Sequence, residues 1–343
     1  MSKQYRIAAV SCLALVATLL GGCAAPVVKT YGMDDHFSSS EIMSGSTATA
    51  DQCARTVNAV WVDVGAYHEC VVYFPSSAFA AGAPIDRAIV FMEGDRLDGK
   101  QMAEAQYEKS SPRVLTRAAE REQQRAGLPY LILGRPGTDG SSGSQRVRRT
   151  HYETLVVNAA LDQIKRKYQI QQLGIIGQSG GGGLVGALIS ERQDVLCGVA
   201  SSGVTAVKYR IQEKGWTADI TGIGTSEVWD PVDQLPRARP MPGFRLFATS
   251  DKLDGDVPFD SQQYFIQKAQ EAGLPAVQIV VHASGSVHHQ TFPIGNKVMA
   301  DCMKGVPTET IVARYTGHYV DQKEEAKAFP PTQAKAGTSS TAE

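Results

Sequence analysis

Short runs of apolar residues recur through the middle of the chain, separated by polar and glycine-rich stretches. Most of these runs are continuous and do not alternate with polar residues, which is typical of strands buried on both faces of a sheet. The pattern predicts strands at residues 69–74, 88–92, 130–133, 173–176, 195–200, 244–248 and 277–281.

Helical patterns lie between several of the predicted strands, at residues 152–168, 183–192 and 261–272. Within the first of them, one helix face would carry Leu155, Val156, Ala159, Ala160 and Ile164. Strands that alternate with helices indicate a mainly parallel central sheet flanked by helices, so we expect an α/β fold.

The expected domain covers residues 55–322, and the remaining segments lie around or within it. Residues 204–242 fit no strand and are expected to form a small insertion near the functional site. Residues 23–54 are rich in Ser, Thr and Ala and suit a flexible tether, whereas residues 323–343 suit a disordered tail.

The first 22 residues have the pattern of a secretory signal. Lys3 and Arg6 precede an apolar run at residues 7–20, and small residues follow. Only fourteen residues separate Arg6 from Gly21, whereas a membrane-spanning helix needs roughly 20. We therefore expect an exported protein whose signal peptide is removed.

The segment Leu20-Gly21-Gly22-Cys23 resembles the bacterial lipobox, in which the cysteine is acylated and becomes the new N-terminus. The resemblance implies that Cys23 is lipidated and that the protein is anchored to the membrane of the cell envelope, facing the periplasm or the exterior. The alternative is an ordinary signal peptide cut elsewhere, which would give a soluble exported protein.

Charge and cysteine content narrow the classes of function. The formal net charge is −1, with both signs interspersed, so the chain has no basic stripe and we expect no nucleic-acid partner. Apart from Cys12 and Cys23 it has four cysteines, an even number in an exported chain. We favour a disulfide between Cys53 and Cys70, which would staple a short N-terminal loop; buried free thiols are the alternative.

The segment Gly177-Gln178-Ser179-Gly180-Gly181 carries the candidate chemistry. It directly follows the predicted strand 173–176 and opens a helical pattern, which is the context of a nucleophile elbow. Gly177 and Gly181 lack side chains that would collide with the strand or the helix in such a turn. Ser179 is therefore the candidate nucleophile.

Two backbone amides are candidates for stabilising an oxyanion beside Ser179. The Gly180 amide lies at the start of the helix, where the helix dipole also favours negative charge. A second donor normally comes from the loop after an early strand, and Asp95 lies in the loop after the predicted strand 88–92. We expect the Asp95 amide to be this donor.

The other triad members should follow late strands, in the order acid and then histidine. Asp251, Asp254 and Asp256 follow the predicted strand 244–248, and His288 and His289 follow the strand 277–281. We choose Asp254 and His288 as the catalytic pair and keep the other three as alternatives.

At these positions the chain resembles α/β-hydrolases, especially prolyl-oligopeptidase-like serine peptidases and related esterases. In those enzymes the triad acid lies four residues before the proline of a Val-Pro pair, and Asp254 stands in this relation to Pro258. The segment 134–143 also resembles their Arg-Gly-x-Gly-x-Ser loop. We expect this segment to form a turn that shapes the pocket wall; contact between Arg135 and a substrate carboxylate is the alternative. The resemblance implies an acyl-enzyme on Ser179, formed without cofactor or metal from a peptide or a small ester, and leaves the oligomeric state open.

Rival interpretations fit the sequence less well. Glycines 177, 180 and 183 could form a dinucleotide loop, but residues 200–203 lack the acidic partner that such a loop needs. The adjacent His288 and His289 could suggest a metal site, but no HExxH motif or Cys/His spacing accompanies them. We expect a serine-peptidase-like hydrolase; a carboxylesterase and a non-catalytic envelope binding protein on the same fold are the alternatives.

Overall fold

The computed structural model describes residues 30–98, 101–102 and 107–320. The predictions of a signal peptide, of lipidation at Cys23 and of a disordered tail at 323–343 lie outside the described residues. Within these ranges, no helix combines the length and the apolar character needed to cross a bilayer.

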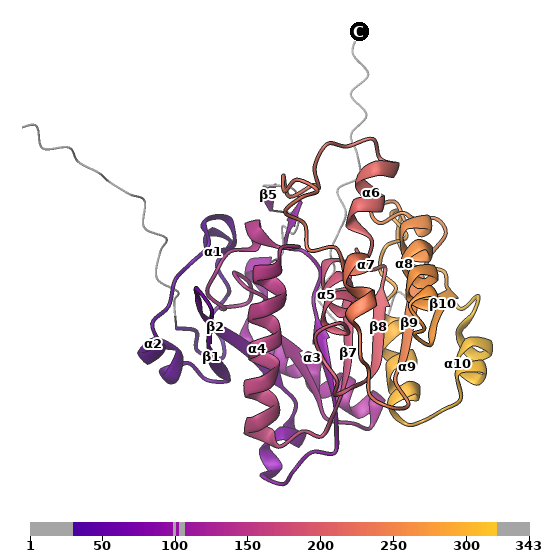
Figure 1. Cartoon of the computed structure of the whole chain (residues 1–343). Helices are drawn as coiled ribbons and strands as arrows, with labels where there is room; N and C mark the ends of the chain where they lie inside the picture. Colours follow the sequence, from indigo (N-terminus) through magenta and orange to yellow (C-terminus); the bar gives the residue numbers. More distant parts are fainter. Residues whose placement is uncertain (1–29, 99–100, 103–106, 321–343) are drawn as a thin grey trace, which may run out of the picture.

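An eight-stranded sheet forms the centre of the molecule (Figure 1). Its order is β1-β2-β6-β3-β7-β8-β9-β10; the neighbours from β6 to β10 run parallel, and β1, β2 and β6 pair antiparallel. The strands are β1 (Ala59–Val64), β2 (Tyr67–Pro75), β3 (Arg87–Met92), β6 (Tyr130–Leu133), β7 (Gln172–Gln178), β8 (Val195–Ser201), β9 (Arg245–Ser250) and β10 (Ala276–Val280), and β4 (Leu97–Asp98) and β5 (Gln101–Met102) form a separate hairpin. All the strands predicted from the sequence are confirmed, whereas β1, β4 and β5 are additional.

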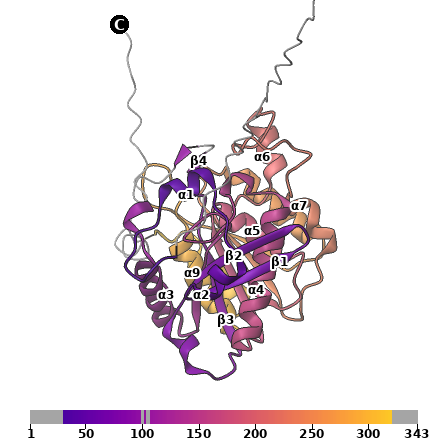
Figure 2. The ribbon, with the colours of Figure 1, turned by 90° about the vertical axis from the view of Figure 1, so that its left-hand side faces the viewer.

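Helices cover both faces of the sheet and close two apolar cores. One core joins the sheet to α4 (His151–Tyr168), α5 (Gly180–Leu188) and α8 (Phe259–Glu271). The other joins it to α3 (Pro112–Ala126), α9 (Phe292–Met303) and α10 (Thr308–Tyr315). Figure 2 shows α3 and α4 on opposite sides of the strands. The mainly parallel α/β architecture is therefore confirmed, since sheets buried on both faces are typical of that class.

Helix α3 is not among the helices expected from the sequence, although both of its ends carry local signals. The Ser111 side chain caps the first turn by accepting from the Val114 amide, and Pro112 occupies the first helical position. Gly127 ends the helix in the left-handed conformation. A search for caps before a search for strands would have found this helix.

The segment before the domain is folded over residues 30–54, so the expectation of an unstructured tether is wrong for this part of the chain. It contains α1 (Ser39–Ser44) and α2 (Ala50–Arg55). Phe37 and Ile42 are buried, and the Phe37 ring packs against those of Phe74 and Tyr107. Scattered aromatic residues rather than a helical period hold this segment on the domain, which explains why periodicity missed it.

Two disulfides link these parts of the structure. Cys53 of α2 is joined to Cys70 of β2, which confirms the predicted pairing, and Cys197 of β8 is joined to Cys302 of α9. Disulfides form and persist in oxidising compartments and are rare in the cytosol. Both bonds therefore favour a location outside the cytoplasm.

The segment 204–242 leaves the sheet between β8 and β9 and returns to it. It carries two short helices, α6 (Val207–Glu213) and α7 (Pro231–Gln234). The Val204 amide, at its start, donates to the Ser179 carbonyl at 3.0 Å. The segment thus begins directly against the candidate nucleophile.

Candidate active site

Ser179 occupies the sharp turn between the end of β7 and the first residue of α5. Its backbone angles are φ 54° and ψ −118°, outside the regions that a serine normally adopts. The Ser179 amide donates to the Ser201 carbonyl at 2.9 Å, which ties the turn to the neighbouring strand β8. A strained conformation held in this way is typical of a nucleophile elbow.

Glycines make this turn sterically possible. A Cβ on Gly177 would lie 2.2 Å from the Gly181 carbonyl carbon, and one on Gly181 would lie 2.3 Å from the Met92 carbonyl oxygen. The requirement for glycine at both positions is therefore confirmed. The structure adds a third: a Cβ on Gly180 would lie 2.0 Å from Asp95 Oδ1.

The candidate acids and histidines follow strands that neighbour β7. Strands β7, β8, β9 and β10 are adjacent and parallel, so their carboxyl ends meet at one edge of the sheet. Asp251 and Asp254 follow β9, and His288 and His289 follow β10. The sheet therefore brings these residues to the same edge as Ser179.

Asp254 pairs with His289. The His289 Nδ1 atom lies 2.9 Å and 3.0 Å from the two Asp254 carboxylate oxygens. Both side chains are buried, and Asp254 Oδ1 also accepts from the amides of Asp256 and Val257. Such bonds hold the imidazole in one orientation.

The predicted pairing of Asp254 with His288 is wrong, because His288 belongs to a second pair. Its Nδ1 atom lies 3.1 Å from Asp251 Oδ2, and its backbone is left-handed at φ 52°. This turn directs the two successive imidazoles to different carboxylates. The third alternative, Asp256, has an exposed side chain and contributes its backbone amide to Asp254.

Gln178 connects the nucleophile to the histidine loop, a role that the sequence analysis did not assign. Its side chain donates to the His289 carbonyl at 2.9 Å and accepts from the Phe292 amide at 3.2 Å. An amide side chain between Gly177 and Ser179, at the end of a buried strand, is the signal that could have identified it. Among the described residues, the Ser179 hydroxyl makes no hydrogen bond to either imidazole; catalytic hydrogen bonds are often long before substrate binds.

The loop after β3 lies over the nucleophile, as expected for an oxyanion site. A Cβ on Gly94 would lie 3.2 Å from the Ser179 Cβ. Within the described part of the chain, the amides of Gly180 and Asp95 donate to no protein acceptor. Both donors are therefore available to a ligand, as an oxyanion site requires.

A buried charge network holds the Asp95 side chain. Its carboxylate contacts Arg135 and Arg148 at 3.0 Å each and Arg149 at 2.5 Å. Burial alone would raise the pKa of Asp95, but the Arg149, Arg135 and Arg148 guanidiniums outweigh it and hold the pKa well below its usual range. Arg135 also pairs with the buried Glu153 at 2.6 Å. Its guanidinium is therefore engaged by two carboxylates of the protein rather than by a substrate.

The site can move protons and stabilise an anion, but the described residues offer no cluster of three or more metal-binding side chains. A serine on a strained turn, a buried imidazole–carboxylate pair and two free amides are the groups that acyl transfer uses. All of them come from the carboxyl edge of the sheet.

Comparisons with known proteins were made by sequence and by structure. No family model matches the chain, and the search of curated proteins found no match. Among solved structures, the Pyrococcus furiosus esterase Pf2001 has a TM-score of 0.48 and 14% identity, over 78% of this chain and 94% of the esterase. Est1E from Butyrivibrio proteoclasticus has a TM-score of 0.48 and 12% identity, over 73% of this chain and 98% of its own.

A peptidase is similar to the same degree. An acylaminoacyl peptidase in complex with Z-Gly-Gly-Phe-chloromethyl ketone has a TM-score of 0.48 and 15% identity, over 78% of this chain but only 43% of the peptidase. The chain thus spans less than half of that enzyme. At these identities the neighbours say nothing of activity, and the strand order and the elbow carry the structural assignment. By its strand order and by the turn at Ser179, the chain has an α/β-hydrolase fold.

Proposed function

We propose that this protein is a serine hydrolase with Ser179 as nucleophile, His289 as general base and Asp254 as the residue that orients His289. The observation that carries the proposal is the His289–Asp254 pair, which lies on the strand ends beside the strained Ser179 turn. His289 replaces His288 in this proposal because it is His289 that meets Asp254.

The reaction would proceed by two acyl-transfer steps. His289 Nε2 takes the Ser179 proton as Oγ attacks the carbonyl carbon, and the leaving group departs with that proton. Water then attacks the acyl-enzyme with the same proton transfer and releases the acid. Proton transfer of this kind contributes on the order of 10² to 10⁴ in rate.

The amides of Gly180 and Asp95 would stabilise the negative oxygen in both steps. One such donor lowers the barrier by about 2.7 to 4 kcal/mol. The Asp95 carboxylate lies close to Gly180, and the three arginines neutralise it, so it does not repel the developing charge.

The substrate in this proposal is an ester or an amide of small size. We lean toward peptides because of the sequence resemblance to prolyl-oligopeptidase-like enzymes, and esters are the alternative. The insertion 204–242 would decide between them, since it begins against Ser179.

A fluorophosphonate probe tests the nucleophile directly. The purified protein should gain the mass of one probe adduct, and the Ser179→Ala variant should gain none. Failure of the folded wild type to react would contradict the enzyme assignment and favour the non-catalytic binding protein. A thermal melt of both proteins shows that they are folded.

We further propose that Cys23 carries a lipid that anchors the protein to the cell envelope. The lipobox-like segment before Cys23 and the two disulfides support this proposal. Mass spectrometry of the membrane fraction should find an acylated N-terminal peptide starting at Cys23. Cys23→Ser should abolish the modification, and an unmodified wild-type cysteine would contradict the proposal.

A further inference from the structure

Arg210 of α6 is a buried cation whose hydrogen-bonding capacity is only partly used. Its side chain is 7% exposed, and its Nη2 atom donates to the Asp256 carbonyl at 3.1 Å. Among the described residues, its Nε and Nη1 atoms have no hydrogen-bond partner. Buried donors are nearly always paired in folded proteins, so two unpaired nitrogens on one guanidinium require an explanation.

The nearest carboxylate does not satisfy Arg210. Asp219 Oδ1 forms an ion pair with Arg210 Nη1 at 3.8 Å, but this separation is beyond hydrogen-bond range. Asp219 Oδ2 instead pairs with Arg149 and accepts from the Thr221 amide at 3.0 Å. Burial lowers the pKa of Arg210, and the neighbouring Arg149 lowers it further, so an additional anion would relieve an unfavourable environment.

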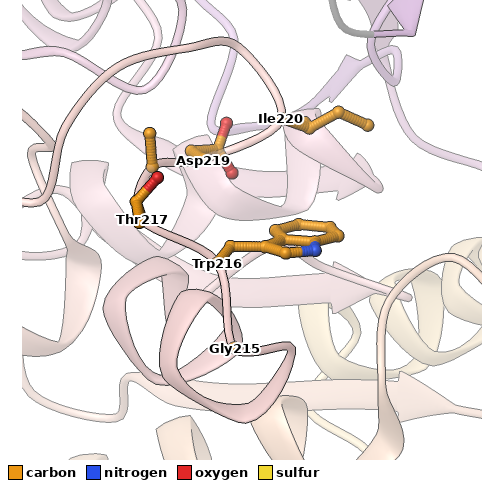
Figure 3. A pocket seen from close by; sticks show the side chains of 6 residues that line it. Gly215, Trp216, Thr217, Asp219 and Ile220 are labelled. Atoms are coloured by element: carbon orange, nitrogen blue, oxygen red, sulfur yellow. The ribbon is translucent and has the colours of Figure 1, made fainter.

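A short loop covers this guanidinium. The Trp216 ring centroid lies 5.4 Å from the Arg210 guanidinium carbon, and Trp216 is 40% exposed. Residues 215–220 line an open hollow of about 480 Å³. Figure 3 shows the Trp216 ring and the Asp219 carboxylate on this loop. Trp216 thus lines the hollow and also lies over the Arg210 guanidinium.

Arg210 is also connected to the candidate active site. The Asp256 carbonyl that it binds belongs to the loop whose Asp254 holds His289. The Asp256 amide donates to Asp254 Oδ1 at 3.0 Å in the same turn. A group bound at Arg210 would therefore lie against the loop that carries Asp254.

We propose that Arg210 binds a carboxylate group of the substrate, with Trp216 as the cover that moves aside to admit it. This inference rests on the proposed hydrolase function and assigns its substrate class: esters or amides with a free carboxylate near the scissile bond. A monoanion fits better than a phosphate dianion because Asp219, only 3.8 Å from Nη1, repels the second charge. The carboxylate accepts hydrogen bonds from the nitrogens that now have none.

A pair of esters of similar size tests the proposal without requiring turnover. The Ser179→Ala protein is titrated calorimetrically with p-nitrophenyl hemisuccinate, which carries a carboxylate, and with neutral p-nitrophenyl butyrate. We expect the hemisuccinate to bind at least tenfold more tightly, and the additional Arg210→Gln substitution to remove that preference. Equal affinity for the two esters, or a preference that survives Arg210→Gln, overturns the inference.

A control variant and a rate measurement separate this result from a loss of folding or of function. Arg239→Gln removes the same charge from an exposed position in the same insertion and should keep the preference. In the protein with Ser179 intact, Arg210→Gln should lower kcat/KM for the hemisuccinate at least tenfold and leave the butyrate rate within threefold. An equal fall for both esters would make Arg210 a structural brace. Fluorophosphonate labelling of Ser179, measured separately, reports on the hydrolase function itself.

Discussion

Two histidine–aspartate pairs lie side by side at the carboxyl edge of the sheet, yet they differ in depth and in support. In His289–Asp254 the side chains are 10% and 0% exposed, whereas the His288 side chain of the other pair is 35% exposed. Asp251 resembles Asp254 in accepting two backbone amides, those of Leu253 and Ala283. Of the two adjacent histidines, His289 is the one whose backbone carbonyl accepts a hydrogen bond from Gln178, the residue that precedes Ser179.

The difference shows that a carboxylate partner alone does not identify a catalytic imidazole. Both pairs have suitable hydrogen bonds, but a general base must also be held against its nucleophile and shielded from water. The His289–Asp254 pair is buried, and Gln178 ties the His289 backbone to the turn at Ser179. In the other pair Asp251 is buried, but the His288 side chain is partly exposed to solvent.

The largest expected effect separates the two histidines. His289→Gln should lower kcat/KM for an activated ester by roughly 10⁴-fold or more, since it removes the general base. His288→Gln is the matched control and should lower it by less than about tenfold. Steady-state rates of the two purified variants decide the matter, and the opposite ranking would assign the base to His288.

The two carboxylates should follow the same ranking. Asp254→Asn should cost on the order of 10⁴-fold in kcat, because an amide cannot hold the imidazole in the required tautomer. Asp251→Asn should cost about tenfold or less, because it affects only the outer pair. A comparable fall in both variants would mean that the pairs act as one unit, which a double variant would show as non-additive.

A smaller loss of kcat is expected from a substitution at Gly180, which leaves both histidine–aspartate pairs intact. Gly180→Ala would place a methyl group against the Asp95 carboxylate and displace the Gly180 amide. Loss of one oxyanion donor lowers kcat by about 10² to 10³-fold. Gly224→Ala is the control, because a Cβ there meets only Glu227 Oε2, at 3.9 Å. Unchanged kcat in Gly180→Ala would place the oxyanion elsewhere.

The smallest effect on activity is expected from removing an ion pair remote from the site. This variant distinguishes a loss of catalytic activity from a loss of stability. Asp194 contacts Lys165 at 2.6 Å and Arg192 at 2.7 Å. Asp194→Asn should lower the free energy of unfolding by about 2 kcal/mol and leave kcat unchanged. A large fall in kcat would show that a loss of stability alone can reduce activity. The activities of the histidine and aspartate variants would then need a correction for stability before they could be interpreted as catalytic effects.

This stability difference should depend on pH with a defined sign. Burial raises the pKa of Asp194, but hydrogen bonds from Arg192 and Lys165 outweigh it, so the pKa in the folded protein lies below its usual value. A carboxyl with a depressed pKa stabilises the fold above its unfolded pKa of about 3.9 and loses that contribution as the pH falls further. Chemical denaturation of wild type and variant between pH 3 and pH 7 should therefore show a difference that shrinks in acid.

Local patterns were sufficient for most of the fold and for the nucleophile. Continuous apolar runs identified the buried strands, because residues inside a parallel sheet are apolar on both faces. The local pattern did not predict edge strand β1 or the folded segment 30–54, because their burial depends on partners distant in the chain. Helix α3 differs, because its ends carry local signals in the sequence: Ser111 and Pro112 at the start and Gly127 at the end.

The sequence by itself identified Ser179 as the candidate nucleophile, because glycines that a sharp strand-to-helix turn requires lie two residues to either side of it. It also indicated that the candidate acids and histidines follow late strands, and it favoured the Cys53–Cys70 disulfide that the structure contains. Only the tertiary structure decided which histidine meets which aspartate, because a left-handed turn at His288 sends adjacent side chains to different partners. It alone also brought Asp95 against Gly180 and left Arg210 with unpaired nitrogens, since such contacts join residues far apart in the chain.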